Sequence, residues 1–178
     1  MLESLITSKT RIKLLLKFFL NINNQGYLRN LEQEFNESTN GIRQELNRFE
    51  NAGLLLAENE GNKKLYRANT RHPLFKDLNS IIRKFVGVEE LLEKVIDRLG
   101  NVQQVYLEGK IAQGLDSDVI DLLLIGNEID RNYLSNLVEK AEPVLKKHIK
   151  YVVCEEEKGK HYVQKHKKEL VLIFDYTV

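Results

Sequence analysis

The sequence predicts an α+β protein: a helical N-terminal domain with one β-hairpin, a long linker helix, and a small C-terminal α/β domain with a mixed sheet. Three observations predict this. Apolar residues between 8 and 53 recur at helical spacing, and two short strand-like runs follow them. Between residues 73 and 99, apolar residues again recur in steps of three and four. After Gly100, strand-like runs alternate with helical ones. We therefore expect domains at residues 1–72 and 100–178, joined by a helix over 73–99.

The composition is that of a packed globular protein, with 42% hydrophobic and 30% charged residues among 178. Its longest apolar runs, such as residues 122–125, are far shorter than the roughly 18–20 residues that cross a bilayer. The first residues do not resemble a secretory signal, and the single cysteine, Cys154, permits no internal disulfide. These features predict a cytoplasmic protein without a membrane partner.

The N-terminal domain is expected to hold three helices and a hairpin. The first helix follows Ser8, and the second covers residues 27–35. The third begins at Ser38 or Thr39 and ends at Gly53, because glycine is favoured just after a helix. Its inward residues are Ile42, Leu46 and Phe49, and the hairpin strands are residues 54–57 and 64–67 with Gly61 and Asn62 at the bend.

Three helices followed directly by a basic hairpin are the order of a winged helix-turn-helix. Residues 41–55 (GIRQELNRFENAGLL) and 62–69 (NKKLYRAN) resemble the recognition helix and the wing of ArsR-like bacterial transcription regulators. The resemblance covers roughly residues 8–69. It implies double-stranded DNA as a partner and a role in transcription regulation. The distribution of charge is weakly consistent with DNA binding, because residues 1–72 carry a net charge of +3 and the remaining residues carry −2.

The outward face of the third helix and the wing tip supply the candidate DNA contacts. Arginine can bind guanine, asparagine and glutamine can bind adenine, and lysine at the wing suits phosphate. A solvated polar face is the alternative interpretation, and Glu45 and Glu50 on the same helix would repel DNA. The candidate contacts are Ser38, Thr39, Asn40, Arg43, Gln44, Asn47, Lys63 and Lys64.

The linker helix carries a heptad-like apolar seam from Leu78 to Leu99, with Gly87 in its middle. The positions between its ends are Ile81, Phe85, Val88, Leu92 and Val95. Such a seam either packs within one chain or joins two chains. Because a winged helix that reads a two-fold operator usually works as a dimer, we expect a homodimer.

The C-terminal domain is expected to have strands at residues 102–107 and 119–125, a helix from Asp130 to about 149, and two further strands near 150–154 and 170–175. Residues 107–125 (LEGKIAQGLDSDVIDLLLI) are similar to the signature of minimal nucleotidyltransferases of the DNA-polymerase-beta-like superfamily. In that family a Gly-Ser turn binds nucleotide phosphates. Two aspartates at alternate strand positions hold two Mg²⁺ ions.

This chain departs from the signature at the residues that carry the chemistry. Lys110 stands at the serine position, and Asp118 and Asp121 are three residues apart, so on a regular strand they point to opposite faces. Val119 occupies the place of the partner acid; a bulge could restore the pair, and Asp175 is a further candidate acid. We therefore predict no catalytic residues, no metal and no cofactor. A remnant nucleotide or anion site is expected at Gly109, Lys110, Asp118 and Asp121.

Taken together, the sequence favours a DNA-binding transcriptional regulator whose nucleotidyltransferase-like domain is catalytically inactive and serves as a ligand-binding or scaffold module, with a nucleotide or another small molecule as its candidate ligand. On this interpretation the protein is not an enzyme. The alternative is a metal-dependent nucleotidyltransferase that uses the winged helix for docking, and a third interpretation is a protein-interaction module.

Overall fold

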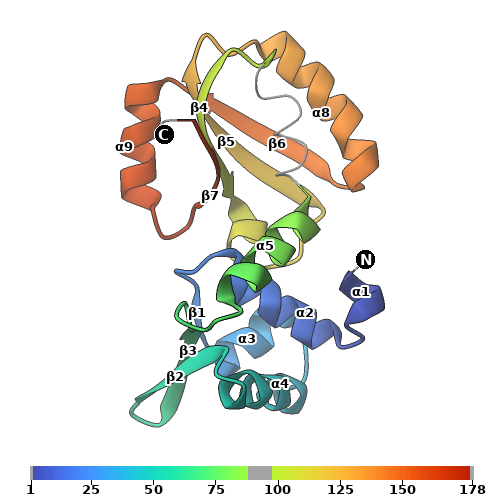
Figure 1. Ribbon diagram of the computed structural model, residues 1–178, viewed down its shortest axis with the longest axis vertical. Coiled ribbons are helices and arrows are strands. Elements are labelled where there is room, and N and C mark those ends of the chain that lie inside the picture. The colour runs from blue at the N-terminus through green and yellow to red at the C-terminus, as the bar shows by residue number, and fades with distance from the viewer. Residues whose placement is uncertain (1, 88–97, 177–178) are drawn as a thin grey trace. The chain divides into compact units, whose positions relative to one another are not determined.

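A computed structural model describes residues 2–87 and 98–176 of the chain (Figure 1). The contacts divide it into one unit of Met1–Phe85 with Gln113–Leu115, and a second of Val86–Ala112 with Asp116–Val178. Each unit combines helices with a sheet, so the predicted α+β class is confirmed. None of the described helices is long and apolar enough to cross a membrane.

The helices of the first unit begin at polar caps. Ser8 precedes α2 and accepts a hydrogen bond from the Arg11 backbone N–H, and Ser38 does the same for Gly41 at the start of α4. Phe18, Phe19, Leu31, Ile42 and Leu46 are fully buried between the helices. The helices are α1 (Leu2–Leu5), α2 (Lys9–Leu15), the π-helix η1 (Leu16–Leu20), α3 (Leu28–Phe35) and α4 (Thr39–Asn51).

A three-stranded antiparallel sheet completes this unit, in the order β1-β3-β2. The predicted hairpin is present as β2 (Leu55–Glu60) and β3 (Lys63–Ala68). Strand β1 (Gln25–Tyr27) was not predicted, because a run of three residues around Gly26 has no strand periodicity. At the end of α4, Gly53 has a φ of +72°, and the Asn69 side chain donates to its carbonyl at 2.8 Å.

The predicted linker helix is described only in its first half, as α5 (Phe75–Val86). It ends where Gly87 adopts a φ of +84°, a conformation that breaks a right-handed helix. Ile82 and Val86 are its buried residues, whereas Ile81, expected on the seam, is 44% exposed. The remaining seam positions through Val95, including Leu92, lie outside the described residues, so the homodimer stays a prediction.

The second unit is built on a four-stranded sheet in the order β6-β5-β4-β7. Only β5 and β6 run parallel, so the predicted mixed sheet is confirmed. Figure 1 shows α8 and α9 on opposite faces of this sheet. Its elements are β4 (Asn101–Glu108), α7 (Gly109–Ala112), β5 (Val119–Asn127), α8 (Arg131–Leu145), β6 (His148–Cys154), α9 (Glu156–His166) and β7 (Val171–Asp175).

Strand β5 is buried on both faces, which explains its nearly continuous apolar sequence. On the α9 face, Leu123 and Ile125 pack with Tyr106 and Leu170. Gly159 lets α9 approach closely, since a Cβ there would lie 2.7 Å from the Ile125 side chain. The sheet therefore holds the start of β5 rigidly beside the end of β4.

Candidate functional site

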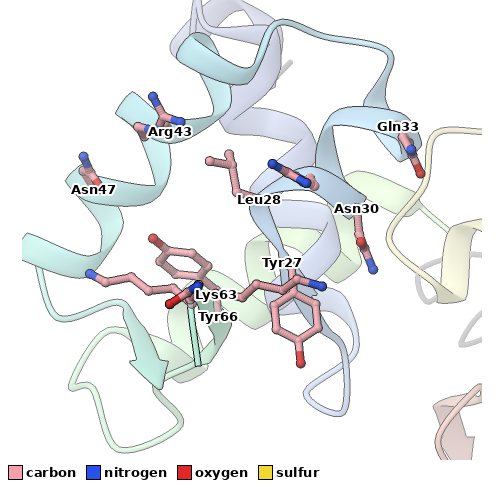
Figure 2. A pocket seen from close by; sticks show the side chains of 11 residues that line it. Tyr27, Leu28, Asn30, Gln33, Arg43, Asn47, Lys63 and Tyr66 are labelled. Atoms are coloured by element: carbon pink, nitrogen blue, oxygen red, sulfur yellow. The ribbon is translucent and has the colours of Figure 1, made fainter. Parts of the chain in front are cut away.

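The first candidate site is a groove of about 670 Å³ in the N-terminal unit, formed by α3, α4 and the β2–β3 hairpin. Figure 2 shows Arg43 and Asn47 on α4 across from Asn30 and Gln33 on α3, with Lys63 and Tyr66 from the hairpin. Its charged lining residues are all cationic. We call it the basic groove, and it is lined by Tyr27, Leu28, Arg29, Asn30, Gln33, Arg43, Asn47, Asn62, Lys63, Lys64 and Tyr66.

Half of the predicted DNA contacts line the basic groove, namely Arg43, Asn47, Lys63 and Lys64. The others, Ser38, Thr39, Asn40 and Gln44, are not among its lining residues. The Ser38 hydroxyl caps α4, and Asn40 accepts a hydrogen bond from the Arg43 guanidinium at 3.4 Å. Asn40 thus orients Arg43 within the helix.

The residues on the opposite wall of the groove were not predicted from the sequence. Arg29, Asn30 and Gln33 stand on α3, and Tyr27 immediately precedes this helix. Only the tertiary packing of α3 against α4 brings these residues opposite Arg43. The one local signal was the polar run at the start of the second helix, with Arg29 as its cation.

The carboxylate of Glu45, which we expected to repel DNA, is turned into the unit. It is 7% exposed and accepts hydrogen bonds from Arg11 at 2.9 Å and from Ser8 at 3.2 Å, and it also pairs with Arg48. Burial raises its pKa, but the hydrogen bonds and charges of Arg11, Ser8 and Arg48 outweigh burial. The pKa of Glu45 therefore lies below its ordinary value of 4.5.

The cations of the hairpin have partners within the same unit. Lys64 lies 3.0 Å from the Glu50 carboxylate of α4, and this hydrogen bond raises the pKa of Lys64. Arg67 pairs with Glu58, which lies diagonally across the two strands. The Lys63 ammonium lies over the Tyr27 ring, 5.8 Å from its centroid. Among the described residues, Lys63 has no carboxylate within ion-pair distance, although Glu60 stands opposite it across the two strands.

The second candidate site is at the end of β4 and the start of β5. The antiparallel register places Glu108 directly opposite Asp121, so the two side chains share one face of the sheet. Gly109 follows with a φ of +66°, and a Cβ there would lie 2.4 Å from Asp121 Oδ2. Glycine is therefore required at this turn, and Asp121 packs directly on it.

The structure separates the acids that the sequence grouped together. Asp118 precedes β5, is exposed, and its carbonyl accepts the His148 N–H at 2.7 Å. The pairing of β5 with β6 runs without a register shift from Val119 to Ile125, so no bulge lies between Val119 and Asp121 to turn Asp118 toward Asp121. Asp175 pairs with Gln104, four residues from Glu108 and thus about 13 Å along the strand. The partner of Asp121 is Glu108, which the signature comparison could not reveal.

The carboxylate pair has two polar neighbours on the same face. Lys150 of β6 is paired in register with Asp121, so Glu108, Asp121 and Lys150 form a row across three strands. Tyr162 of α9 donates a hydrogen bond to Glu108; burial, followed by this bond, raises the tyrosine's pKa. Lys110, at the position of the family's serine, is exposed on α7.

The carboxylates of the second site are candidate ligands for a metal ion. Within residues 2–87 and 98–176, no group of three or more His, Cys, Asp or Glu side chains is placed to hold an ion. Glu108 and Asp121 nevertheless supply two carboxylates on one face. Mg²⁺ is commonly bound by one or two carboxylates, with water and substrate phosphates completing its shell. The pair therefore suits one Mg²⁺ that arrives with a nucleotide, not a closed protein cage.

No family model matches the sequence, and neither does any protein with a curated description. Three solved structures are similar to about half of the chain. A toxin–antitoxin protein with AMP-PNP is 18% identical, with a TM-score of 0.39 over 50% of this chain and 74% of that one. A mutant of the toxin–antitoxin MntA-HpeT is 16% identical, with a TM-score of 0.40 over 52% and 74%. A protein assigned as a nucleotidyltransferase, from Sulfolobus solfataricus, is 24% identical, with a TM-score of 0.36 over 53% and 83%.

These neighbours correct the leading sequence interpretation. We predicted a DNA-binding transcriptional regulator with an inactive C-terminal domain, and therefore no enzyme. The three similar structures are described as toxin–antitoxin and nucleotidyltransferase proteins, and the regulator interpretation is not maintained. They give no support to the ArsR-like winged helix.

Proposed function

We propose that this chain is a nucleotidyltransferase that docks on double-stranded DNA through its N-terminal unit. The proposed transfer activity is based on the carboxylates of Glu108 and Asp121, which face each other on adjacent strands beside the Gly109 turn. Two carboxylates on one face of the sheet can bind a metal ion that positions the phosphates of a nucleotide. Docking is carried by the basic groove.

Each residue of the second site has a role in this proposal. Glu108 and Asp121 would hold Mg²⁺, which supplies positive charge to the phosphates when bound. Tyr162 fixes the Glu108 carboxylate through its hydrogen bond, as outer-shell groups orient metal ligands. Lys150, next to Asp121 in the row, would bind a phosphate oxygen as a point charge.

Replacing Lys150 with Gln is expected to weaken nucleotide binding about tenfold, because a charge-assisted contact to phosphate is worth roughly 1.5–3 kcal/mol when made. Calorimetric titration with ATP and Mg²⁺ measures this effect. Lys140→Gln is the matched control, since Lys140 is an exposed lysine of α8 on the opposite face of the sheet. Equal affinity in both variants would remove Lys150 from the site.

The basic groove and the α4 face suit DNA for a physical reason. Arg43 and Asn47 project from one helix, and their groups can bind guanine and adenine edges in a major groove. Arg29 across the groove and Lys63 on the wing are positioned for the phosphates that flank it. On this proposal the N-terminal unit would work as a winged helix does and bring the transferase to a nucleic acid.

Binding to random-sequence duplex DNA, measured by fluorescence anisotropy between 50 and 200 mM salt, tests the docking. Lys63→Ala is expected to weaken binding to every sequence and to lower the log–log salt slope by about 0.9, the value for one lost phosphate contact. Arg43→Ala is expected to relax sequence preference as well. Lys9→Ala serves as the control, because Lys9 is an exposed residue of α2 that does not line the groove. A salt slope that Lys63→Ala leaves unchanged would exclude the wing from the interface.

A further inference from the structure

We propose that Glu50 is an internal competitor of DNA: it occupies Lys64 in the free protein and thereby sets the affinity of the basic groove. This inference rests on the proposed docking function and concerns its regulation. The wing carries Lys63 and Lys64 side by side, yet the two lysines differ in their contacts. Lys63 lies over an aromatic ring, whereas Lys64 is bound by a carboxylate.

The contact between Lys64 and Glu50 is two-pronged. The lysine Nζ lies 3.0 Å from Oε1 and 3.3 Å from Oε2 of the glutamate. The two residues come from different elements, β3 and α4, so the pair joins the wing to the helix beside the groove. It also directs the Lys64 charge toward the protein. A DNA phosphate can accept a hydrogen bond from the Lys64 ammonium only after Glu50 releases the ammonium or shares it with the phosphate.

The position of the pair makes the competition specific to the groove. Lys64 lines the groove, and Glu50 stands one helical turn from Asn47 on the same helix. Both side chains keep access to solvent, with 47% of Lys64 and 30% of Glu50 exposed. An exposed pair exchanges partners readily, because its net stability in water is small. The pair therefore lowers DNA affinity without locking the wing.

The first test is the neutral variant Glu50→Gln, whose DNA affinity is compared with that of the unmodified chain at about 100 mM salt. We expect binding about two- to fivefold tighter, the range that corresponds to the strength of exposed ion pairs. The salt slope should also rise by about 0.9, because Lys64 then displaces an additional counterion from DNA. Unchanged affinity and slope in Glu50→Gln would overturn the inference.

A second comparison separates competition for Lys64 from simple repulsion between Glu50 and DNA. In a Lys64→Ala background, competition predicts that adding Glu50→Gln has no further effect, whereas repulsion predicts the same gain as before. Glu50→Asp keeps the charge but shortens the reach, so it should tighten binding under competition and leave it unchanged under repulsion.

These outcomes are distinct from a failure of the proposed docking. If the unmodified chain and Glu50→Gln both fail to bind duplex DNA at low salt, the docking function itself is wrong. If both bind equally, docking stands and the competition is wrong. A gain that persists without Lys64 would also overturn the inference in favour of repulsion.

Discussion

Asp121→Asn is expected to abolish Mg²⁺-dependent incorporation of labelled nucleotides by this chain. The substitution keeps the size of the side chain packed on Gly109 but removes the charge opposite Glu108. Losing one arm of a metal clamp removes several kcal/mol of transition-state stabilisation, and each 1.36 kcal/mol is about tenfold in rate. We therefore expect a loss of at least about 100-fold. The assay offers labelled ATP, GTP, CTP and UTP with Mg²⁺ or Mn²⁺, with duplex DNA, the protein itself and small hydroxyl compounds as acceptors.

The matched variants identify the second carboxylate. Glu108→Gln should lose activity as Asp121→Asn does, because the two acids act as one pair. Asp118→Asn should retain it, because Asp118 is exposed and precedes the strand. If Asp118→Asn is inactive and Glu108→Gln is active, the partner of Asp121 is Asp118 and not Glu108. An unmodified chain that transfers no nucleotide to any acceptor refutes the proposed activity.

Much of the fold was predictable because local signals agree with the tertiary structure. The hydrophobic spacing of Ile42, Leu46 and Phe49 identifies the buried face of α4, and all three are buried. The nearly continuous apolar run of β5 predicts a strand covered on both faces, and α8 and α9 cover it. The helix predicted to begin at Asp130 is α8, and the Asp130 carboxylate caps it by accepting the Tyr133 N–H at 2.9 Å.

The remaining features depend on pairings that no local pattern encodes. Glu108 lies opposite Asp121 only because of the register of two antiparallel strands. A signature made of two aspartates close in sequence does not include Glu108. The α3 wall of the basic groove depends on how α3 packs against α4. Similarly, Glu45 was expected to repel DNA because it lies on the helix that carries the candidate DNA contacts. Its carboxylate is instead directed toward Arg11 of α2. Register and helix packing are long-range properties, so residues near in sequence did not reveal them.

Glu45→Ala is expected to lower the free energy of unfolding of the N-terminal unit by about 2–3 kcal/mol at pH 7. The substitution removes a buried carboxylate and leaves Arg11 without its partner; hydrogen bonds to charged groups contribute roughly 1.5–3 kcal/mol each. The figure stays below the 3–5 kcal/mol typical of fully buried pairs, because 35% of the Arg11 side chain is exposed. Urea denaturation followed by circular dichroism measures the change.

The control is Arg48→Ala, which breaks the other ion pair of the same carboxylate. Arg48 is 61% exposed, so its loss should cost less than about 0.5 kcal/mol. If Arg48→Ala destabilises the unit as much as Glu45→Ala does, the helix itself and not the Arg11 contact explains the effect. Equal stability of Glu45→Ala and the unmodified chain would contradict the assigned role of the carboxylate.

The lowered pKa of Glu45 determines how its contribution to the free energy of unfolding changes with pH. The folded unit holds the pKa of Glu45 below the ordinary 4.5, so the unfolded chain binds this proton more readily than the folded one. The stabilisation is therefore fully present above pH 4.5 and is lost as the pH falls through the folded pKa. Glu45→Gln, which cannot ionise, should lack this part of the acid dependence. The difference in unfolding free energy between the two proteins should accordingly shrink below pH 4.5 and stay constant from pH 6 to pH 8.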